Sequence, residues 1–562
     1  MSLLLLAVLP LLALSSPPFP PPPLASSPPV VPPTVVLPST NQTVTGTSSP
    51  SVSAFHALPF AAPPTGALRF SPPSPPAPSS APIDGTERGA ICPQFDVRNN
   101  LYLGSEDCLT LSVYAPSGAV SSGNGPPSSS APLPVMVWLF GGGFAVGDGA
   151  EFGLYDGTAL AESKNAVVVS PNYRVGALGF LASAALPDSG NFGLQDQRRA
   201  LEWVQANIAA FGGDPDNVMI FGQSAGAISV CAHYANGEAS AGLFSAAVME
   251  SGTCDSPEFF RAFGDSEAYS KEYAKSVGCE GDGDAYVECL RSLPTKEIIA
   301  GVVHGDAAYV PPLAPIMAFV PTISGSASGV PELPLASIKA GRSMAARGVP
   351  LALGSNQDEG SIFVPALPVM VPGFRYPFTR GSDVELAVHH ILDPVLGADV
   401  VGEHFDELMA HYPQSKPSDQ MMMILRDYVF LCPSRRAARA VSASGSADAF
   451  MYQFHYKNLW ADVVELGDYH GVEIYFIFDT YGLPGMELLH PFLVGEKAMV
   501  EVMQGYWAGM AKQQRPKYEG GVNWPAYDRQ QEQYMELNWP AVVKTDLNGE
   551  VCDYHDKMLN LY

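Results

Sequence analysis

The residues with the clearest chemical use are a serine and its flanking glycines, in the segment Gly222-Gln223-Ser224-Ala225-Gly226. An apolar strand-like run, 218–221, precedes this segment, and an apolar helix-like run follows it. In a strained turn from strand to helix the serine oxygen is exposed, and glycines on both sides avoid the clashes that a Cβ would cause. The pattern predicts Ser224 as a nucleophile, with the N–H of Ala225 directed into the same space.

A run of glycines, Gly141-Gly142-Gly143, follows the strand-like run 135–140. Successive glycines let backbone N–H groups approach a ligand without obstruction, and each such donor to an oxyanion is worth roughly 3–4 kcal/mol. The alternatives are a flexible turn or a phosphate-binding loop. The second is disfavoured because no Lys-Ser or Lys-Thr pair follows and no G-x-G-x-x-G spacing is present. We expect Gly142, Gly143 and Ala225 to form an oxyanion hole.

A base must take the proton of the serine hydroxyl, and in a turn of this type the acid and then the base follow the serine in the chain. One of the eleven histidines, His470, follows the last strand-like run and has a small residue beside it. His455 lies within a strand-like segment and His389-His390 within a helix-like one. We therefore predict His470 as the base.

The acid that orients this base is expected at the end of an intervening strand. Asp358 and Glu359 both follow the strand-like run 350–354, and their spacing does not separate them. Either one can equally be a solvated acid at the start of a helix. This chemistry needs no metal or organic cofactor, and the chain has no zinc-ligand spacing.

The elements that must position these residues alternate between short β-branched runs and helical patterns, which is typical of a mainly parallel sheet covered on both faces. One helix is indicated by apolar residues at 201, 204, 208 and 211, with Gly212-Gly213 as its stop. We predict one α/β domain over 55–562 with helical insertions. The strand-like runs are 135–140, 166–170, 218–222, 246–250, 350–354 and 450–456.

The amino-terminal segment is different in composition. The apolar run 3–14 is too short to span a bilayer, and we expect a secretory signal peptide over 1–16. Residues 17–54, rich in Pro, Ser, Thr and Val, predict an extended, exposed leader. We therefore expect a secreted, extracellular protein with no stable membrane span. The sequon Asn41-Gln42-Thr43 offers a glycosylation site at Asn41.

The counts of charged residues bear on one large class of function, the binding of nucleic acid. Lys plus Arg number 30 against 56 Asp plus Glu, a formal charge of -26, which disfavours nucleic acid as a partner.

The eight cysteines of an exported chain predict disulfides. Spacing pairs Cys92 with Cys108 and Cys279 with Cys289 across short loops, and lets Cys432 tie Cys552 of the final helix to the body. Cys231 is expected to be a buried free thiol, and Cys254 has no obvious mate.

Together these features resemble the type B carboxylesterase family, the carboxylesterase/cholinesterase group of the α/β-hydrolase fold. The resemblance covers nearly the whole chain after the leader. Beyond the serine turn, the segments similar to family signatures are 58–70, 105–109, 172–176, 190–197 and 211–215.

The resemblance implies a carboxylic ester hydrolase that acts on a small-molecule or lipid ester through an acyl-enzyme. It assigns Glu359, rather than Asp358, as the triad acid and His470 as the base. It also implies the same oxyanion hole, an auxiliary serine at Ser251, the three disulfides above and a buried ion pair between Glu106 and Arg174.

Two departures bear on the substrate. Gln223 replaces the acidic residue that cholinesterases carry before the nucleophile, and the loop between Cys92 and Cys108 contains no Trp to bind quaternary ammonium. Choline esters are therefore disfavoured. The rival interpretations are a non-catalytic adhesion protein, and a thioesterase, amidase or lactone-opening enzyme on the same fold.

Overall fold

The structure is a computed structural model. It describes residues 32–96, 99–120, 131–301, 317–326, 328–367, 371, 380–414, 416–456, 466–480 and 494–559. The signal peptide expected over 1–16 lies outside these residues.

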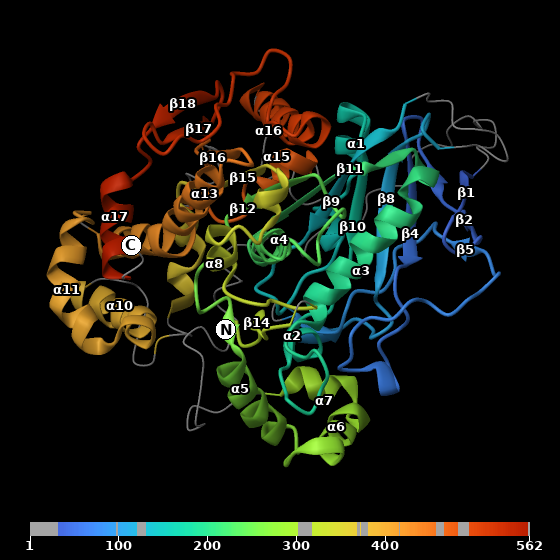
Figure 1. The fold of residues 1–562 in the computed structure, drawn as a ribbon, viewed down its shortest axis with the longest axis horizontal. Helices are drawn as coiled ribbons and strands as arrows, with labels where there is room; N and C mark the ends of the chain where they lie inside the picture. The colour runs from blue at the N-terminus through green and yellow to red at the C-terminus, as the bar shows by residue number, and fades with distance from the viewer. Residues whose placement is uncertain are drawn as a thin grey trace, which may run out of the picture.

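An eleven-stranded mixed sheet runs through the centre of the molecule (Figure 1). Its strands are β3 (Thr47–Ser48), β4 (Val52–Pro59), β8 (Thr110–Pro116), β9 (Leu133–Leu139), β10 (Val167–Pro171), β11 (Gly213–Gln223), β12 (Ala246–Glu250), β15 (Leu351–Asn356), β16 (Ala449–Phe454), β17 (Gln533–Leu537) and β18 (Val542–Thr545). The order is β18-β17-β16-β15-β12-β11-β9-β10-β8-β4-β3. The strands from β10 to β17 pair in parallel, and the outer strands pair antiparallel.

The parallel strands are mostly apolar because both faces of the sheet are covered. In β9 all seven residues are buried. Successive side chains of a strand point to opposite faces, so Val135 and Val137 join one apolar layer while Met136 and Trp138 join the other. The predicted α/β architecture is confirmed, and each of the six strand-like runs lies in this central region.

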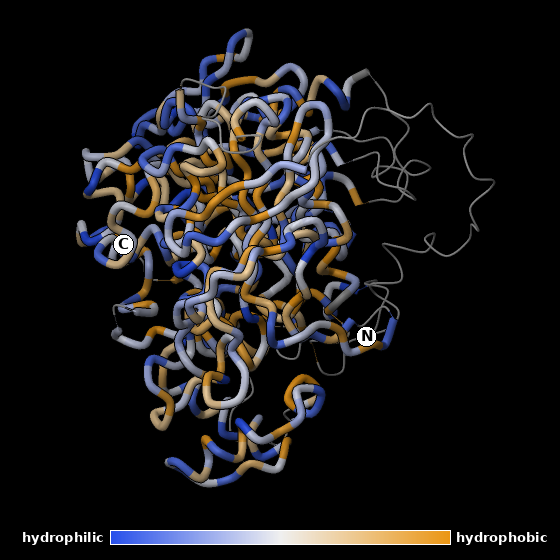
Figure 2. Tube along the Cα trace, turned by 90° about the vertical axis from the view of Figure 1, so that its right-hand side faces the viewer, coloured by the Kyte–Doolittle hydropathy of each residue, from blue (hydrophilic) through white to orange (hydrophobic). Residues whose placement is uncertain are grey.

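Helices cover both faces of the sheet. Against the layer of Val135 lie α3 (Phe192–Asn207), α4 (Ala225–Ala235), α8 (Pro334–Lys339) and α13 (Cys432–Ser444). Against the layer of Trp138 lie α1 (Thr158–Lys164), α15 (Ile474–Phe478) and α16 (Val494–Gln513). Figure 2 shows hydrophobic residues concentrated in the interior between these layers.

Two groups of helices are added to this frame, each with its own small apolar cluster. The first, seen at the bottom of Figure 1, comprises α5 (Phe263–Ser276), α6 (Gly283–Ser292) and α7 (Thr295–Ala300). The second, at the left, comprises α10 (Gly381–Leu396), α11 (Ala398–Ala410) and α12 (Pro417–Leu425), with α17 (Gly549–Met558) beside it.

Short elements complete the described structure. The remaining strands are β1 (Thr34–Val36), β2 (Thr43–Thr45), β5 (Ile83–Asp84), β6 (Gln94–Asp96), β7 (Leu101–Leu103), β13 (Arg261–Ala262) and β14 (Thr322–Ile323). The short helices and turns are α2 (Gly176–Phe180), η1 (Gly66–Leu68), η2 (Glu151–Gly153), η3 (Ile208–Phe211), η4 (Met344–Arg347), η5 (Glu359–Ile362), η6 (Val364–Ala366) and the π-helical η7 (Arg426–Leu431).

The second half of the expected leader is folded, so the prediction for 17–54 is wrong there. β1, β2 and β5 form a small sheet, and Val35, Leu37 and Val44 are buried in the main core. The reason is a period-two pattern, in which buried valines alternate with more exposed residues. Average composition hides this pattern. Residues 17–31 lie outside the part of the chain that the structure describes.

All eight cysteines are bonded. S–S bonds join Cys92 to Cys108, Cys279 to Cys289 and Cys432 to Cys552. The expectation of a free thiol at Cys231 is wrong, because Cys231 on α4 is bonded to Cys254, which follows β12. The two positions come together because β11 and β12 are parallel neighbours, so α4 after one and the loop after the other start at the same edge.

The expected ion pair between Glu106 and Arg174 is also wrong. Glu106 accepts two hydrogen bonds from Arg69, of 2.8 and 2.6 Å. The guanidinium group of Arg174 instead donates two hydrogen bonds of 2.7 Å to the carboxylate of Asp196, near the start of α3. Each arginine has a closer carboxylate that allows the bidentate geometry.

No helix among the described residues has both the length and the apolar character needed to cross a membrane.

Candidate active site

The strand order reverses beside the predicted nucleophile. β10 lies on one side of β9, and the next strand in the chain, β11, lies on its other side. Crevices at the carboxyl ends of strands at such a reversal are the usual ligand sites of open α/β sheets. Gly141-Gly142-Gly143 follows β9 and Ser224 follows β11, so the two predicted motifs meet there. A Cβ added to Gly141 would stand 3.2 Å from the Cβ of Ser224.

Ser224 occupies a strained backbone conformation between β11 and α4. Its φ is 58° and its ψ is -123°, a combination that costs energy for a residue with a Cβ and that is typical of functional sites. Its N–H donates to the carbonyl oxygen of Glu250 at 2.9 Å. A Cβ on Gly226 would stand 1.9 Å from the carbonyl oxygen of Leu139, so only glycine lets α4 start this close to β9.

The glycine loop presents its backbone to the same space. Gly142 and Gly143 have φ values of 107° and 63°, which glycine adopts without strain. The carbonyl of Gly142 accepts from the amides of Ala145 and Val146, and this closes the turn. Ala225 is the first residue of α4, so its N–H has no acceptor within the helix. The structure therefore brings the three expected oxyanion donors to one end of the sheet.

The structure also brings His470 and Glu359 together. Nδ1 of His470 donates to Oε2 of Glu359 at 2.6 Å, and the exposed fractions of the two side chains are 8% and 0%. Asp358 makes a different contact: its Oδ2 accepts from the N–H of Asp468 at 2.9 Å, and its own N–H donates to the carbonyl of Asp468 at 3.1 Å. Glu359 thus contacts the imidazole, while Asp358 tethers the loop that carries it.

The other ring nitrogen of His470 faces Gln223. The Nε2 atom lies 3.1 Å from Nε2 of the Gln223 carboxamide. With Nδ1 protonated toward Glu359, this Nε2 is the acceptor and Gln223 donates to it. Among the described residues, no hydrogen bond joins His470 to the Ser224 hydroxyl. Catalytic hydrogen bonds of this kind often tighten only when substrate is bound. The sequence contained no signal for this contact of Gln223.

Aromatic side chains surround the imidazole. The rings of Phe363 and Phe430 have centroids 5.0 and 4.8 Å from the His470 ring. The start of α4 packs into a further apolar cluster, whose members include Phe144, Phe180, Leu194, Ile228, Phe259, Phe260, Val320 and Val330. Apolar side chains therefore pack against both the imidazole and the start of α4. Sequence reasoning missed Phe430, which lies in the π-helical η7, and π-helical turns have no clear sequence signature.

The predicted auxiliary serine makes no side-chain hydrogen bond within the described part of the structure. Ser251 is fully buried after β12 with a φ of 54°.

Two buried acids lie close to the predicted catalytic residues. Burial raises the pKa of Glu250 well above its usual value, and the proximity of Glu473 raises it further, although Trp507 donates to Glu250 at 2.6 Å. Burial, followed by the proximity of Glu359, raises the pKa of Glu473 to about 7. Within the described ranges, no group of three or more His, Cys, Asp and Glu side chains has an arrangement suited to a metal ion.

A central, mainly parallel sheet with a strained serine turn at its strand-order reversal defines the α/β-hydrolase class. Comparison with known proteins shows which family of that class the chain belongs to. The carboxylesterase family matches residues 35–555, so the chain belongs to this family and is a carboxylic ester hydrolase.

Relatives within the family are named for different activities. The chain is 34% identical over 532 residues to pyrethroid hydrolase Ces2e of Rattus norvegicus, and the match covers 90% of this chain and 86% of that protein. It is 34% identical to acylcarnitine hydrolase of Mus musculus, and the match covers 90% of this chain and 87% of that protein. It is 33% identical to acetylcholinesterase of Bungarus fasciatus, with 90% and 83% covered.

Solved structures show the same fold. A PNB esterase superposes with a TM-score of 0.73 at 29% identity, covering 93% of this chain and 99% of its own. A thermophilic PNB esterase superposes with a TM-score of 0.75 at 28% identity, covering 94% and 99%.

Proposed function

We propose that the protein hydrolyses carboxylic esters through an acyl-enzyme on Ser224, with His470 as base and Glu359 as acid. The observation that carries this proposal is the 2.6 Å contact between Nδ1 of His470 and Glu359 beside the strained serine turn. It fixes the tautomer in which Nε2 is free to take a proton. The contact with Gln223 must then give way when substrate brings the serine hydroxyl to Nε2.

The reaction proceeds in two steps. His470 takes the proton of Ser224 as its oxygen attacks the ester carbonyl, and it returns that proton to the leaving alcohol. Water then attacks the acyl-enzyme, again with His470 as base. In both steps the tetrahedral oxyanion accepts hydrogen bonds from the N–H groups of Gly142, Gly143 and Ala225.

The apolar surroundings favour an uncharged acyl group. Phe363 and Phe430 beside His470 offer aromatic faces, and Gln223 contributes no charge next to the nucleophile. The near-equal identity to pyrethroid, acylcarnitine and acetylcholine hydrolases selects none of their substrates. We propose a neutral small-molecule or lipid ester as substrate, and we disfavour choline esters.

We further propose that the protein is exported. Four disulfides fit an oxidising compartment. The sequon residue Asn41 is exposed in the turn between β1 and β2, with a φ of 57°, and such a site is accessible for glycosylation. Mass analysis of the exported protein with Asn41→Gln as a control tests both points.

Ser224→Ala tests the central proposal. We expect the hydrolysis of a short p-nitrophenyl ester to fall by at least roughly 10⁴-fold, whereas Ser292→Ala on the exposed surface of α6 leaves it unchanged. Full activity in Ser224→Ala would overturn the nucleophile. A labelled organophosphonate that never reacts with the folded wild type would favour a binding protein. Relative turnover of matched ester, thioester and amide substrates separates the remaining rivals.

A further inference from the structure

Asn356, the last residue of β15, lies between the segment of the acid and the segment of the base. Its backbone N–H donates to Oε1 of Glu359 at 2.7 Å, the carboxylate oxygen that His470 does not use. Its carboxamide nitrogen Nδ2 donates to the carbonyl of Tyr469 at 2.9 Å and to Oε2 of Glu473 at 2.5 Å. Asn356, Glu359 and Glu473 are each 0% exposed.

These three hydrogen bonds connect the segment that carries Glu359 with the segment that carries His470. Tyr469 comes directly before His470, and Glu473 follows it three residues later. One carboxamide therefore holds the base segment before and after the imidazole, while the backbone of the same residue holds the acid. Fully buried hydrogen bonds of this kind fix side chains that must stay in a narrow geometry.

The charge of Glu473 matters for this arrangement. The Oε1 of Glu473 and the Oδ1 of Asn356 are both buried without a hydrogen-bond partner among the described residues. Both atoms are acceptors if Glu473 is ionised, and no donor serves either. A proton on Glu473 turns one of its buried oxygens into a donor group and avoids a second buried negative charge close to Glu359.

We propose that Asn356 is a positioning residue for the triad, which holds Glu359 and His470 in register through the Glu473 side chain, and that Glu473 is neutral up to about neutral pH. This inference rests on the proposed function, because it concerns the same site. The hydrogen bonds of Asn356 go to Glu359, Tyr469 and Glu473, so it acts through the acid and the base segment.

Other titratable groups face Glu473 from the surrounding elements. They are Glu359 of η5, His470 and Tyr469 of the base segment, Glu250 of β12 and Tyr452 of β16. Of these, Glu359 favours the neutral form of Glu473, and a protonated His470 opposes it.

The first test replaces Asn356. In Asn356→Ala we expect kcat for a p-nitrophenyl ester to fall by about 10²-fold, the usual effect of displacing a catalytic group by about 1 Å, with KM little changed. Asn356→Asp keeps the shape but adds an acid, so the acid limb of kcat/KM should move to higher pH because the imidazolium gains a negative neighbour. Gln357→Ala, the neighbouring amide, is the matched control.

The second test replaces Glu473. Glu473→Gln has the shape of a neutral carboxyl group and should keep kcat and the acid limb close to those of wild type. Glu473→Ala should lower kcat in the same way as Asn356→Ala. The downfield proton resonance of the His470 Nδ1–H should persist in Glu473→Gln and broaden or disappear in Asn356→Ala.

Two results would overturn the inference. One is an Asn356→Ala enzyme with the kcat, pH profile and proton resonance of Gln357→Ala. The other is a Glu473→Gln enzyme whose kcat falls as far as that of Glu473→Ala, or whose acid limb shifts to lower pH, since either would mean that Glu473 is charged. A wild-type protein that hydrolyses no ester would instead defeat the proposed function, so the two failures are distinguishable.

Discussion

Gly226 shows how closely backbone segments must approach around the serine turn. A Cβ there would meet the carbonyl oxygen of Leu139 at 1.9 Å, and backbone does not yield as a flexible side chain does. We expect Gly226→Ala to displace Ser224 and to lower kcat/KM by at least about 10²-fold. Kinetics with an aryl ester, together with thermal unfolding, measure both effects.

The same substitution at Gly402 provides the control. Gly402 lies inside α11, and a Cβ there meets nothing within 4 Å. Gly402→Ala should raise the free energy of unfolding by about 0.5–1 kcal/mol, because alanine loses less backbone entropy in a helix. If both variants behave alike, the close approach at Gly226 is not the constraint.

The two adjacent acids are separated by what they contact. Glu359→Gln should lower kcat by roughly 10³–10⁴-fold, because the carboxylate that orients and stabilises the imidazolium is lost. Asp358→Asn keeps an oxygen acceptor for the N–H of Asp468 and should stay close to wild type. Initial rates of aryl-ester hydrolysis decide between them, and the reverse order would make Asp358 the acid.

At the residue scale, sequence reasoning yields candidates where chain order and local chemistry constrain a residue. The glycine spacing singled out Ser224, and position after the last predicted strand singled out His470. It missed contacts between residues that are far apart in the sequence and meet only in the folded chain. Nothing in the sequence places Asn356 against Tyr469, because those residues are more than a hundred positions apart and meet only through the register of β15 and β16.

At the element scale, buried parallel strands are the easiest to predict because they read as continuous β-branched runs. The strands in 34–48 were missed because they lie in a segment with the composition of a linker. The bond between Cys231 and Cys254 was missed for a related reason. Its two ends are neighbours only because β11 and β12 are adjacent in the sheet.

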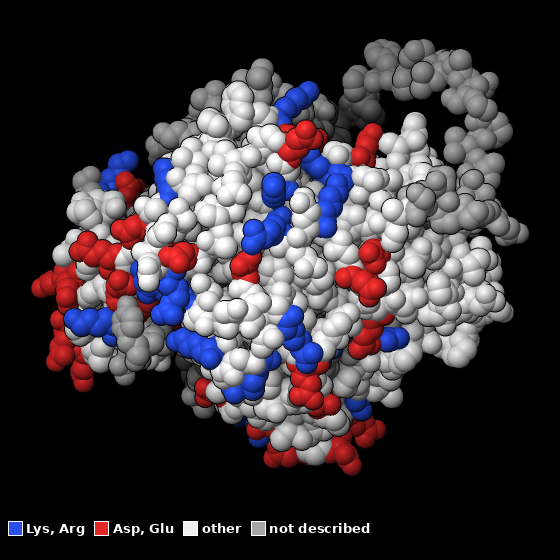
Figure 3. Space-filling model, turned by 45° about the horizontal axis from the view of Figure 1, so that its top comes forward, with Lys and Arg blue, Asp and Glu red and all other residues white. Residues whose placement is uncertain are grey.

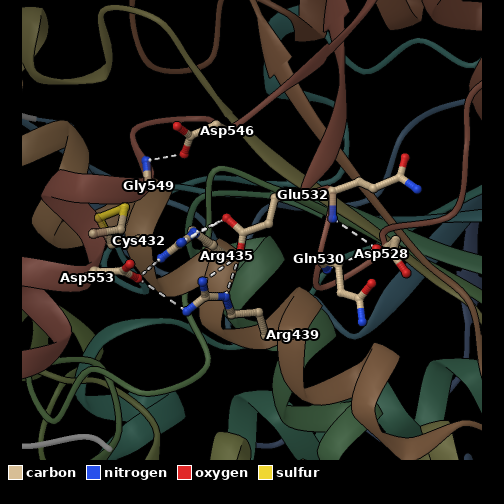
Figure 4. A network of polar contacts seen from close by, with 11 residues as sticks. Cys432, Arg435, Arg439, Asp528, Gln530, Glu532, Asp546, Gly549 and Asp553 are labelled. Atoms are coloured by element: carbon tan, nitrogen blue, oxygen red, sulfur yellow. Dashed lines mark hydrogen bonds and ion pairs between the residues drawn. A yellow bond between two sulfur atoms is a disulfide. The ribbon is translucent and has the colours of Figure 1, made fainter.

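The final helix, α17, is fastened to α13 by a disulfide and by a charged network (Figure 4). Figure 4 shows the guanidinium groups of Arg435 and Arg439 converging on Glu532. Each arginine donates two bonds to Glu532, and both also contact Asp553 of α17. The network therefore joins three segments that are distant in the chain.

Burial predicts different contributions from the two arginines. The side chain of Arg435 is 4% exposed and that of Arg439 is 28% exposed. Removing one partner of a buried pair leaves the other charge uncompensated and costs about 3–5 kcal/mol, whereas exposed pairs contribute about 0–1 kcal/mol. We expect Arg435→Met to lower the free energy of unfolding far more than Arg439→Met does.

Denaturant unfolding of the two variants measures this difference. Arg342→Met is the control, because its ion pair with Glu332 is exposed on the surface and its loss should change stability little. Equal destabilisation by Arg435→Met and Arg342→Met would contradict the role of burial.

At the scale of the whole molecule, the formal charge of -26 is unevenly spread. Figure 3 shows acidic side chains gathered at the left edge of the view, where α10 and α11 lie in Figure 1. Asp399, Glu403 and Asp406 are among the acids of α11. Repulsion among such charges lowers stability at low ionic strength, and salt screens it over about 10 Å at 0.1 M. The pH dependence of stability is therefore best compared between variants at one salt concentration.

Three buried histidines couple folding to pH. Burial is the main cause that lowers the pKa of His56 and His555 to about 4 and that of His233 to about 3, from 6.5. Below pH 6.5 the unfolded chain binds protons that the folded protein does not, so the free energy of unfolding falls as the pH falls toward 4. Because each pKa unit corresponds to about 1.4 kcal/mol, the three together remove several kcal/mol.

Glu473 acts in the opposite direction. Its pKa is about 7 in the folded protein, against an ordinary value of 4.5 for a glutamate side chain, so the folded protein binds the extra proton between these limits. This proton makes the free energy of unfolding fall as the pH rises through that window, and Glu473→Gln should remove the effect. The histidines and Glu473 thus place opposing slopes on the stability between these pKa limits, and the raised pKa of Glu250 acts in the same direction as that of Glu473.

Thermal unfolding between pH 7 and pH 4.5 tests the contribution of the histidines. His233 shares a 2.9 Å hydrogen bond with Oε1 of Gln197, which the uncharged amide of His233→Gln can still supply. We expect this variant to lose less Tm than wild type over that range, whatever its Tm at pH 7, because one proton fewer is taken up on unfolding. His404→Gln is the control, since that side chain is exposed on α11. Parallel Tm curves for His233→Gln and wild type would show that His233 is not a buried neutral group.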